Sequence, residues 1–303
     1  MIQEIEPLIY DPEFRKTEPK DDDKALVYHG KDGILLKYEN GRYILPSVSD
    51  VIGLSYGELA PIINNSYYLF SIDNVGYYLM ELTDTLYEEI PFIKSLDTDI
   101  DNVKLYNGIY TFMRIHRFRE LDPVHMVFAG ATGIHIRNWK ETVKYCGKCG
   151  NQTRPSDTER AFVCSKCGYT AYPKISPAVI VAVINNDRIL LVRNLHRPGN
   201  VRLELVSGFV EIGESFEHAV HREVLEEVGL KVKNLRIYKD QPWGISGAHM
   251  IGYVAEVDGD DTVVRQVDEI SEAKWYRRDE IPEYRNRLSV GSEMILKFKQ
   301  GEL

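Results

Sequence analysis

The stretch from residue 208 to residue 230, GFVEIGESFEHAVHREVLEEVGL, constrains the fold of this chain more than any other. Ser215 is a residue type that caps helix N-termini, and Gly229 lies where a left-handed residue commonly ends a helix. Between them the apolar residues recur at helical spacing: Phe216, Ala219, Val220, Val224 and Val228. The stretch therefore predicts a loop followed by an amphipathic helix.

Three glutamates crowd one face of that helix. Glu223 lies three residues before Glu226 and four before Glu227, and side chains at these separations are neighbours on a helix surface. Like charges so close repel each other unless a cation lies between them. Arg222 is placed to hold Glu226, and the remaining oxygen ligands suit Mg2+ or Mn2+. A solvated acidic face is the alternative, but it would not require the glycines, the arginine and Glu214 together.

All four cysteines lie in one short region, as two Cys-x-x-Cys pairs with fourteen residues between the pairs. This spacing places Cys146, Cys149, Cys164 and Cys167 around one tetrahedral zinc ion. Four thiolates leave no open coordination position, so the predicted site is structural. Disulfides are the alternative, but the first residues lack the features of a signal peptide. The charges around the cysteines are mixed, which favours a structural role over nucleic-acid binding.

The first 140 residues carry two β-hairpin signals. Asn40-Gly41 interrupts the apolar stretch 33–46, and Asp73-Asn74-Val75 joins the apolar runs 67–72 and 76–82. We expect a mostly antiparallel β-rich domain, with a helix that opens at Asp122-Pro123. The basic stretch 114–120 is interpreted as a solvated strand edge, with a phosphate contact by Arg117 or Arg119 as the alternative.

Residues 174–303 alternate strands with helices, which indicates an α/β sandwich. The expected strands are 178–184, 188–194, 235–240, 250–257 and 272–278, and a last helix is expected at about 289–300. The whole chain is thus expected to be α+β, with a β-rich domain (1–140), a zinc ribbon (141–173) and a C-terminal domain (174–303).

The composition limits the partners of this chain. It has 303 residues and a net charge of −9, and a field of that sign does not attract polyphosphates or nucleic acid. An anionic substrate would therefore need metal ions at its site, in agreement with the glutamate helix. No apolar run approaches the length of a membrane span, and we expect a cytoplasmic protein that does not bind membranes.

The 208–230 stretch matches the fixed positions of the Nudix box, and the chain resembles Nudix hydrolases. The order of its parts resembles the zinc-ribbon NADH pyrophosphatase (NAD diphosphatase) family along nearly the whole chain. Trp139, the stretch 172–180 and the stretch 272–282 also resemble that family. The resemblance implies a Nudix α/β/α sandwich at the C-terminus.

The resemblance also implies site residues. Glu223, Glu226, Glu227 and Glu269 would be catalytic and would bind Mg2+ or Mn2+, with the carbonyl of Ser207 as a further ligand. Tyr172 and Phe209 would stack on the nicotinamide. The family's SQPWPFPxS motif corresponds to DQPWGISGA here, so the substrate-binding segment would be Gln241, Pro242, Trp243, Gly244, Ile245 and Ser246.

The implied activity is hydrolysis of the NADH or NAD diphosphate to AMP and NMNH or NMN, by a homodimer with one structural zinc ion per chain. Three alternatives remain. The substrate could be ADP-ribose or another dinucleotide, since Gly-Ile-Ser replaces Pro-Phe-Pro. The same chemistry could remove an NAD cap from RNA. A non-catalytic nucleotide-sensing regulator is disfavoured, because every box glutamate is present and no DNA-recognition helix is evident.

Overall fold

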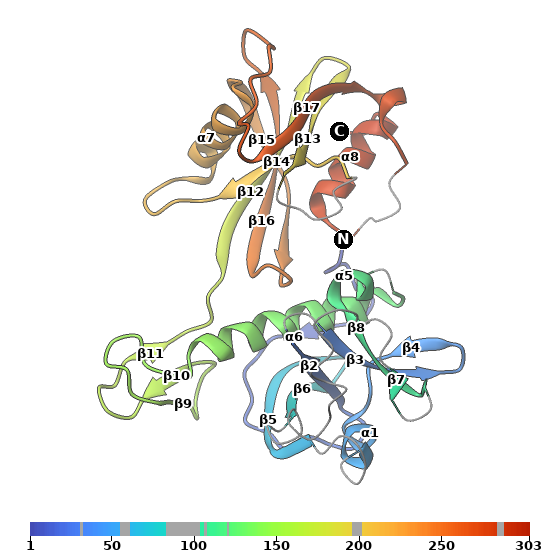
Figure 1. Cartoon of the computed structure of the whole chain (residues 1–303), viewed down its shortest axis with the longest axis vertical. Helices are drawn as coiled ribbons and strands as arrows, with labels where there is room; N and C mark the ends of the chain where they lie inside the picture. The colour runs from blue at the N-terminus through green and yellow to red at the C-terminus, as the bar shows by residue number, and fades with distance from the viewer. Residues whose placement is uncertain are drawn as a thin grey trace. The chain divides into compact units, whose positions relative to one another are not determined.

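The computed structural model describes residues 1–30, 33–54, 61–82, 104–105, 108–119, 121–195, 202–283 and 288–303. The chain divides into two compact units. The first unit contains Met1–Ile2, Ile175–Trp243 and Gly247–Leu303, and the second contains Gln3–Lys174 and Gly244–Ser246. Figure 1 shows the elements of both units. None of the helices in these ranges combines the length and apolar character that a membrane crossing requires.

The second unit is built on an eight-stranded sheet in the order β1-β5-β6-β2-β3-β8-β7, with β4 paired to β3. Its strands are β1 (Tyr10–Asp11), β2 (Lys24–His29), β3 (Gly33–Glu39), β4 (Arg42–Ile44), β5 (Pro61–Ile72), β6 (Val75–Leu82), β7 (Lys104–Leu105) and β8 (Tyr110–Arg114). All pairs are antiparallel except β2 with β6. The β-rich expectation is confirmed for this part of the chain.

Both predicted hairpins form, and their turns explain why. Asn40 and Gly41 join β3 to β4 with φ values of 50° and 81°, and Asp73 and Asn74 join β5 to β6 with φ values of 49° and 63°. Positive φ at both central residues matches the right-handed twist of the strands, and Asn, Asp and Gly tolerate it best. Val75, which was expected in the second turn, is the first residue of β6.

The helices in the described part of the second unit are α1 (Val48–Gly53), α5 (Ile115–Phe118) and α6 (Val124–Thr142). Pro123 is the N-cap of α6 and precedes its first turn. The apolar residues Val127, Phe128, Ala131 and Ile134 of α6 are buried in the core. The expected strand edge at 114–120 is wrong, because β8 ends at Arg114 and the chain turns into α5.

The cysteine region forms a three-stranded sheet in the order β11-β10-β9. Its strands are β9 (Thr153–Pro155), β10 (Phe162–Cys164) and β11 (Thr170–Ala171). Phe162 packs edge-on against Trp139 of α6, with ring centroids 5.4 Å apart. Arg160 donates through Nη2 to the carbonyl of Pro12 at 3.0 Å. These contacts explain why the small sheet clusters with the rest of the second unit.

The first unit has a six-stranded sheet in the order β15-β16-β12-β13-β17, with β14 paired to β12. The strands are β12 (Ser176–Asn185), β13 (Arg188–Asn194), β14 (Val206–Phe209), β15 (Val232–Trp243), β16 (Ala248–Val257) and β17 (Ile270–Arg277). β12 and β16 run parallel, and the other pairs are antiparallel. The five strands expected here are all confirmed.

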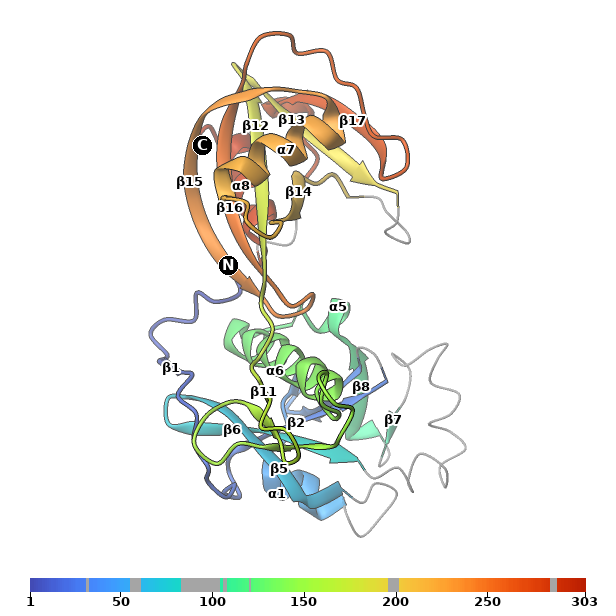
Figure 2. The same cartoon turned by 90° about the vertical axis from the view of Figure 1, so that its left-hand side faces the viewer.

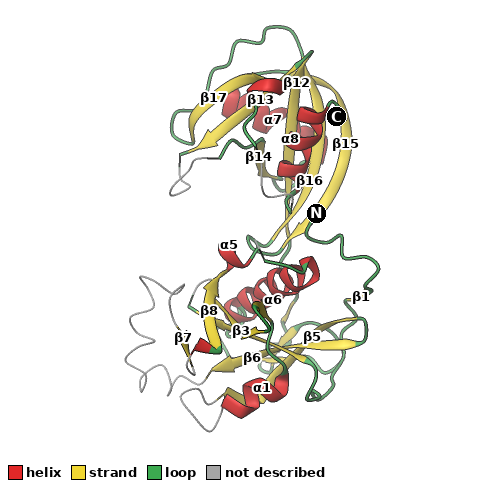
Figure 3. Ribbon diagram, turned by 90° about the vertical axis from the view of Figure 1, so that its right-hand side faces the viewer, coloured by secondary structure: helices red, strands yellow, loops and turns green. Residues whose placement is uncertain are grey.

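Two helices cover the two faces of this sheet, as Figures 2 and 3 show from opposite sides. Helix α7 (Phe216–Val228) packs on a core that includes Val181, Val192 and Val206. Helix α8 (Val290–Gln300), which follows the short 3-10 helix η4 (Arg278–Glu280), packs on Ala182, Leu191 and Leu205. The expected α/β/α sandwich is confirmed.

Candidate functional site

Helix α7 begins and ends at the predicted signals. The Oγ of Ser215 accepts a hydrogen bond from the His218 N–H at 3.1 Å, which satisfies one of the free amides of the first turn. Gly229 takes the left-handed conformation, with φ of 72°. Of the five apolar residues, Phe216 is 37% exposed and the others are buried, so the buried stripe begins at Ala219.

Arg222 fastens the loop before α7 to the helix. Its Nε and Nη2 donate to the two carboxylate oxygens of Glu214, at 2.9 and 2.8 Å. Its Nη1 donates to Glu223 at 2.7 Å and to Glu226 at 3.0 Å, and Nη2 also donates to the carbonyl of Phe209. The predicted contact with Glu226 is confirmed, but the guanidinium also orients two further carboxylates and the end of β14.

Glu214 is an anchor of the loop. Its side chain is only 7% exposed. The bonds from Arg222 and the N–H of Glu211 lower the pKa of this carboxyl to about 2. A carboxylate held by a planar two-pronged cation and a backbone amide has few lone pairs left for a metal. Its place in the motif is therefore explained by loop geometry.

Gly208 allows β14 to pass directly over the helix carboxylates. A Cβ atom at this position would lie 1.9 Å from Cδ of Glu223, which is far inside van der Waals contact. The first glycine of the motif is thus required because any side chain at position 208 would overlap the Glu223 carboxylate.

Glu227 is the most buried carboxylate of the site, with 6% of the residue exposed. Burial raises its pKa to about 8, and the charges of Glu223 and Glu269 add to this effect. The backbone N–H of Ser207 acts in the opposite direction. Burial also raises the pKa of Glu223. Carboxyls whose charged forms are disfavoured in this way release their protons when a cation binds between them, so the donor set fits Mg2+ or Mn2+.

The loop that carries Glu269 is pinned to the C-terminal end of α7. The N–H of Val264 donates to the carbonyl of Val228 at 2.9 Å, and the N–H of Gln266 donates to the carbonyl of Glu227 at 2.8 Å. Glu269 itself accepts through its carbonyl from the N–H of Leu195. These bonds satisfy carbonyls at the helix end and hold Glu269 close enough to Glu227 to affect its pKa.

One acidic residue of this neighbourhood was missed by the sequence analysis. Glu204 also contributes to the raised pKa of Glu227, so the two carboxylates are electrostatic neighbours. The sequence did contain a signal for Glu204. In the extended stretch Leu203-Glu204-Leu205-Val206, Glu204 and the buried Val206 are two residues apart and so lie on the same face.

The last three residues of β15, Gln241 to Trp243, are held near the start of α8 by hydrogen bonds of Gln241. Gln241 is 1% exposed, its Nε2 donates to the carbonyl of Leu288 at 2.7 Å, and its Oε1 accepts from the Val290 N–H at 2.8 Å. Pro242 is exposed and Trp243 half-buried. The amide of Gln241 thus fixes where β15 ends relative to the first turn of α8.

The next three residues, Gly244, Ile245 and Ser246, form a turn that clusters with the second unit. In the first unit, Nε2 of His249 lies 2.7 Å from a carboxylate oxygen of Asp240. His249 is therefore a hydrogen-bonding partner of Asp240, the first residue of the DQPWGISGA segment.

The two aromatic candidates belong to different units. Tyr172, in the second unit, is 59% exposed and its hydroxyl donates to Glu159 at 3.2 Å. Phe209, in the first unit, is 55% exposed at the end of β14. Large aromatic side chains this exposed are available for stacking on a ligand.

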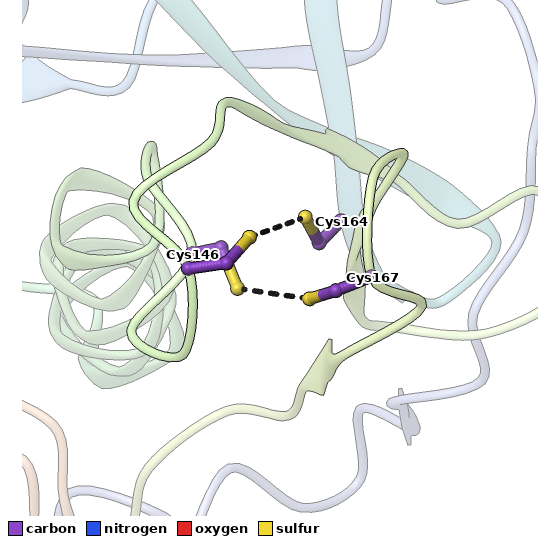
Figure 4. Close-up of side chains that lie close together, drawn as sticks. Cys146, Cys164 and Cys167 are labelled. Carbon is purple, nitrogen blue, oxygen red and sulfur yellow. Dashed lines mark hydrogen bonds between the residues drawn. The ribbon is translucent and has the colours of Figure 1, made fainter.

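The four cysteines converge on one point, as Figure 4 shows for Cys146, Cys164 and Cys167. Their sulfur atoms all lie within 4.8 Å of one another, and no disulfide joins them. Two backbone amides, of Cys167 and Lys166, lower the pKa of Cys164 to about 6. Thiolates stabilised by backbone N–H groups in a compact cluster fit a tetrahedral metal ion. The convergence of all four sulfur atoms on one point favours a metal site over two separate disulfides.

The NUDIX domain family matches residues 174–295 of this chain. The NAD-capped RNA hydrolase NudC of Shigella boydii serotype 18 (strain CDC 3083-94 / BS512) is 44% identical over 163 residues, which cover 54% of this chain and 62% of that protein. The corresponding NudC of Haemophilus influenzae (strain PittEE) is 33% identical over 248 residues, covering 74% and 92%.

Among solved structures, a NUDIX hydrolase from Nitrosomonas europaea matches with a TM-score of 0.44 and 20% identity, covering 52% of this chain and 91% of that one. The sequence comparisons are the stronger ones. This chain therefore belongs to the NudC family of NUDIX domain proteins, as the box, the cysteine pairs and the order of parts indicated.

Proposed function

We propose that this protein hydrolyses the diphosphate of NADH or NAD to AMP and NMNH or NMN, with the help of Mg2+ or Mn2+. The observation that carries the proposal is the buried Glu227 carboxyl, which lies near Glu223 and Glu269 in a site with only oxygen donors. Relatives that share 33% of their residues along 92% of their length are named for hydrolysis at NAD-capped RNA, which supports the dinucleotide as the recognised group.

The reaction adds water to one phosphorus and breaks its bond to the bridging oxygen. Mg2+ or Mn2+, when bound, neutralises phosphate charge and lowers the pKa of water. Glu223, Glu226 and Glu227 would hold the ions, with the carbonyl of Ser207 as a further donor. Glu226, Glu227 or Glu269 would accept the proton that the attacking water releases. Arg222 keeps these carboxylates oriented, since it donates to both Glu223 and Glu226.

The residues that select the substrate are proposed to be the segment after the helix and the two exposed aromatics. Pro242, Trp243 and the Gly244–Ser246 turn would contact the dinucleotide, and Gln241 would place them through its bonds to the start of α8. Phe209 and Tyr172 would stack on the nicotinamide, which an exposed aromatic face favours.

The cysteine cluster is proposed to bind one structural zinc ion per chain. Its four sulfur atoms within 4.8 Å of one another support this role, because four thiolates complete a tetrahedral shell. We further propose a homodimer in the cytoplasm, in line with the resemblance of the whole chain to the NADH pyrophosphatases.

A product assay tests the proposed activity. The zinc-loaded protein is given NADH, NAD and ADP-ribose separately with Mg2+ or Mn2+, and the products are separated by chromatography. We expect AMP and NMNH from NADH at a higher kcat/KM than AMP production from ADP-ribose. Faster cleavage of ADP-ribose would keep the chemistry but reassign the substrate, and would point to Ile245 and its neighbours. No turnover of any of the three would favour a nucleotide-binding regulator.

Removal of the NAD cap from RNA is a second candidate function, favoured by the names of the relatives. It needs the same chemistry at the same carboxylates. A short 5′-NAD-capped RNA and the matching 5′-triphosphate RNA distinguish it from general RNA cleavage. Release of NMN with a 5′-monophosphate RNA, from the capped RNA alone, is the expected result for this function.

A further inference from the structure

Glu204 lies on the face of the first unit's sheet that α7 covers. It pairs with Val192 of β13, and each residue's N–H donates to the other's carbonyl at 2.8 Å. Residues that face each other in this way in an antiparallel pair point their side chains to the same side. Val192 packs in the core that includes Val224 and Val228 of α7. The Glu204 side chain is therefore directed to the α7 side.

The residues beside Glu204 confirm this direction. Leu203 and Leu205 are buried in the cluster that α8 covers, whereas Val206 belongs to the α7 cluster. Glu204 thus occupies a position in an alternating segment where its neighbours are apolar and buried, and it is itself partly buried.

The elements around Glu204 are those that carry the proposed metal ligands. Val192 is three residues before Leu195, whose N–H binds the Glu269 carbonyl. On the other side, Val206 is followed by Ser207, whose N–H donates to Glu227. The electrostatic effect of Glu204 on Glu227 agrees with this placement. The segment before β14, helix α7 and the loop before β17 therefore each carry a carboxylate near this face.

We infer that Glu204 is a further carboxylate of the metal site, opposite the helix glutamates, and that it helps to bind the divalent cations. This inference rests on the proposed function. Glu204, Glu223, Glu227 and Glu269 would carry four negative charges when all are ionised, which two divalent cations would neutralise. Loss of one of these charges lowers the affinity for the cations, and the more weakly held cation is affected most.

The direct test is Mn2+ binding to the full-length, zinc-loaded protein, followed by the electron paramagnetic resonance of free Mn2+. Glu204→Gln keeps the size of the side chain and removes its charge. We expect a rise of about tenfold or more in the Kd of the weaker Mn2+, the scale seen for residues that support metal ligands. The matched control is Asp279→Asn, which removes one charge from an exposed position of the same unit. A Glu204→Gln isotherm equal to that of the control would overturn the inference.

A second measurement separates a metal-binding role from a merely structural one. Adding Mg2+ should raise the Tm of Glu204→Gln by less than it raises the Tm of wild type and of Asp279→Asn, since a more weakly bound cation stabilises the folded state less. An equal increase in Tm in all three proteins would contradict the inference. If Glu204→Gln does not fold, Glu204→Asp takes its place: its shorter side chain withdraws the carboxylate oxygens and should raise the Kd of the weaker Mn2+. A wild-type Kd for Glu204→Asp would then overturn the inference.

The two hypotheses fail in different ways. If wild-type protein binds Mn2+ and turns over NADH, and only Glu204→Gln is without effect, the inference alone is wrong. If the wild type neither binds Mn2+ nor cleaves a dinucleotide, the proposed function and the inference both fail.

Discussion

The cysteine cluster and the glutamate site are both built for cations, but they are assembled in different ways. The cysteines all come from residues 146–167, and two short turns bring their sulfur atoms together. The glutamates come from α7, from the loop before β17 and from the segment before β14, and their elements meet only in the folded sheet. The first site depends on local chain geometry, and the second depends on the packing of the whole first unit.

This difference changes what holds each site before a metal binds. Sulfur atoms in the cluster have only a few backbone amides as partners, such as the Lys148 N–H on Cys146. The glutamate site already has a permanent cation, Arg222, and a loop hydrogen-bonded to α7. We therefore expect metal removal to unfold the ribbon but to leave the glutamate site folded.

The largest effect is expected at the ribbon. Cys164→Ser should abolish zinc binding, since a structural zinc site supplies on the order of 10 kcal/mol to its own folding. Zinc content and hydrogen exchange measure the result: β9, β10 and β11 should lose protection, and α7 should keep it. Retention of one zinc ion per chain by the variant would show that the ribbon does not need Cys164 to bind zinc.

The next effect is on turnover. Glu227→Gln should lower kcat for NADH by roughly 10³-fold or more, because it removes a metal ligand and a candidate proton acceptor. Circular dichroism should remain unchanged. Glu217→Gln, which alters an exposed glutamate of the same helix, is the control and should keep the wild-type kcat. Equal kcat in the two variants would exclude the proposed role of Glu227.

A smaller effect is expected from loss of the Arg222 guanidinium, which orders the loop before α7. Arg222→Ala should lower the free energy of unfolding, since it removes the two-pronged contact with Glu214 and leaves that carboxylate with the N–H of Glu211. Arg222→Lys should restore little, because an ammonium group cannot reproduce the two-pronged contact. Urea unfolding of the three zinc-loaded proteins without added Mg2+ or Mn2+ tests this. Full rescue by lysine would show that charge alone matters.

The last prediction concerns pH. In protein without divalent cations, Glu227 keeps its proton in the folded state up to about pH 8, whereas an unfolded glutamate releases it near pH 4.5. The folded state then binds more protons between these values, so this group's contribution to stability falls as pH rises, by at most about 1.4 kcal/mol per pH unit. Urea unfolding from pH 5 to pH 8 should show a steeper decline for wild type than for Glu227→Gln. Parallel curves would show that Glu227 is already ionised.

Local signals account for what could be predicted. Ser215 and Gly229 fix the two ends of α7, and Asn40-Gly41 fixes the first hairpin, because each acts within a few residues of itself. The four cysteines were sufficient for the ribbon for the same reason. Both the fold class and the clustering of the cysteines therefore followed from short-range patterns.

Long-range contacts account for what could not be predicted. Glu204 faces α7 because it pairs with Val192, twelve residues earlier in the chain. The amide of Gln241 is used by Leu288 and Val290, more than forty residues away. The family motif marks Gln241 but does not show what it contacts, and no motif marks Glu204. The partners of Gln241 and the position of Glu204 therefore came only from the structure.

The central claim is that the glutamate site hydrolyses the dinucleotide diphosphate with divalent cations. The most direct measurement is the initial rate of AMP and NMNH formation from NADH by the zinc-loaded protein, first freed of other divalent cations and then titrated with Mg2+. We predict negligible product without Mg2+ and a saturable rise with it, while zinc stays bound. Product formation at the full rate without added cation, or none at saturating Mg2+ and Mn2+, would contradict the account.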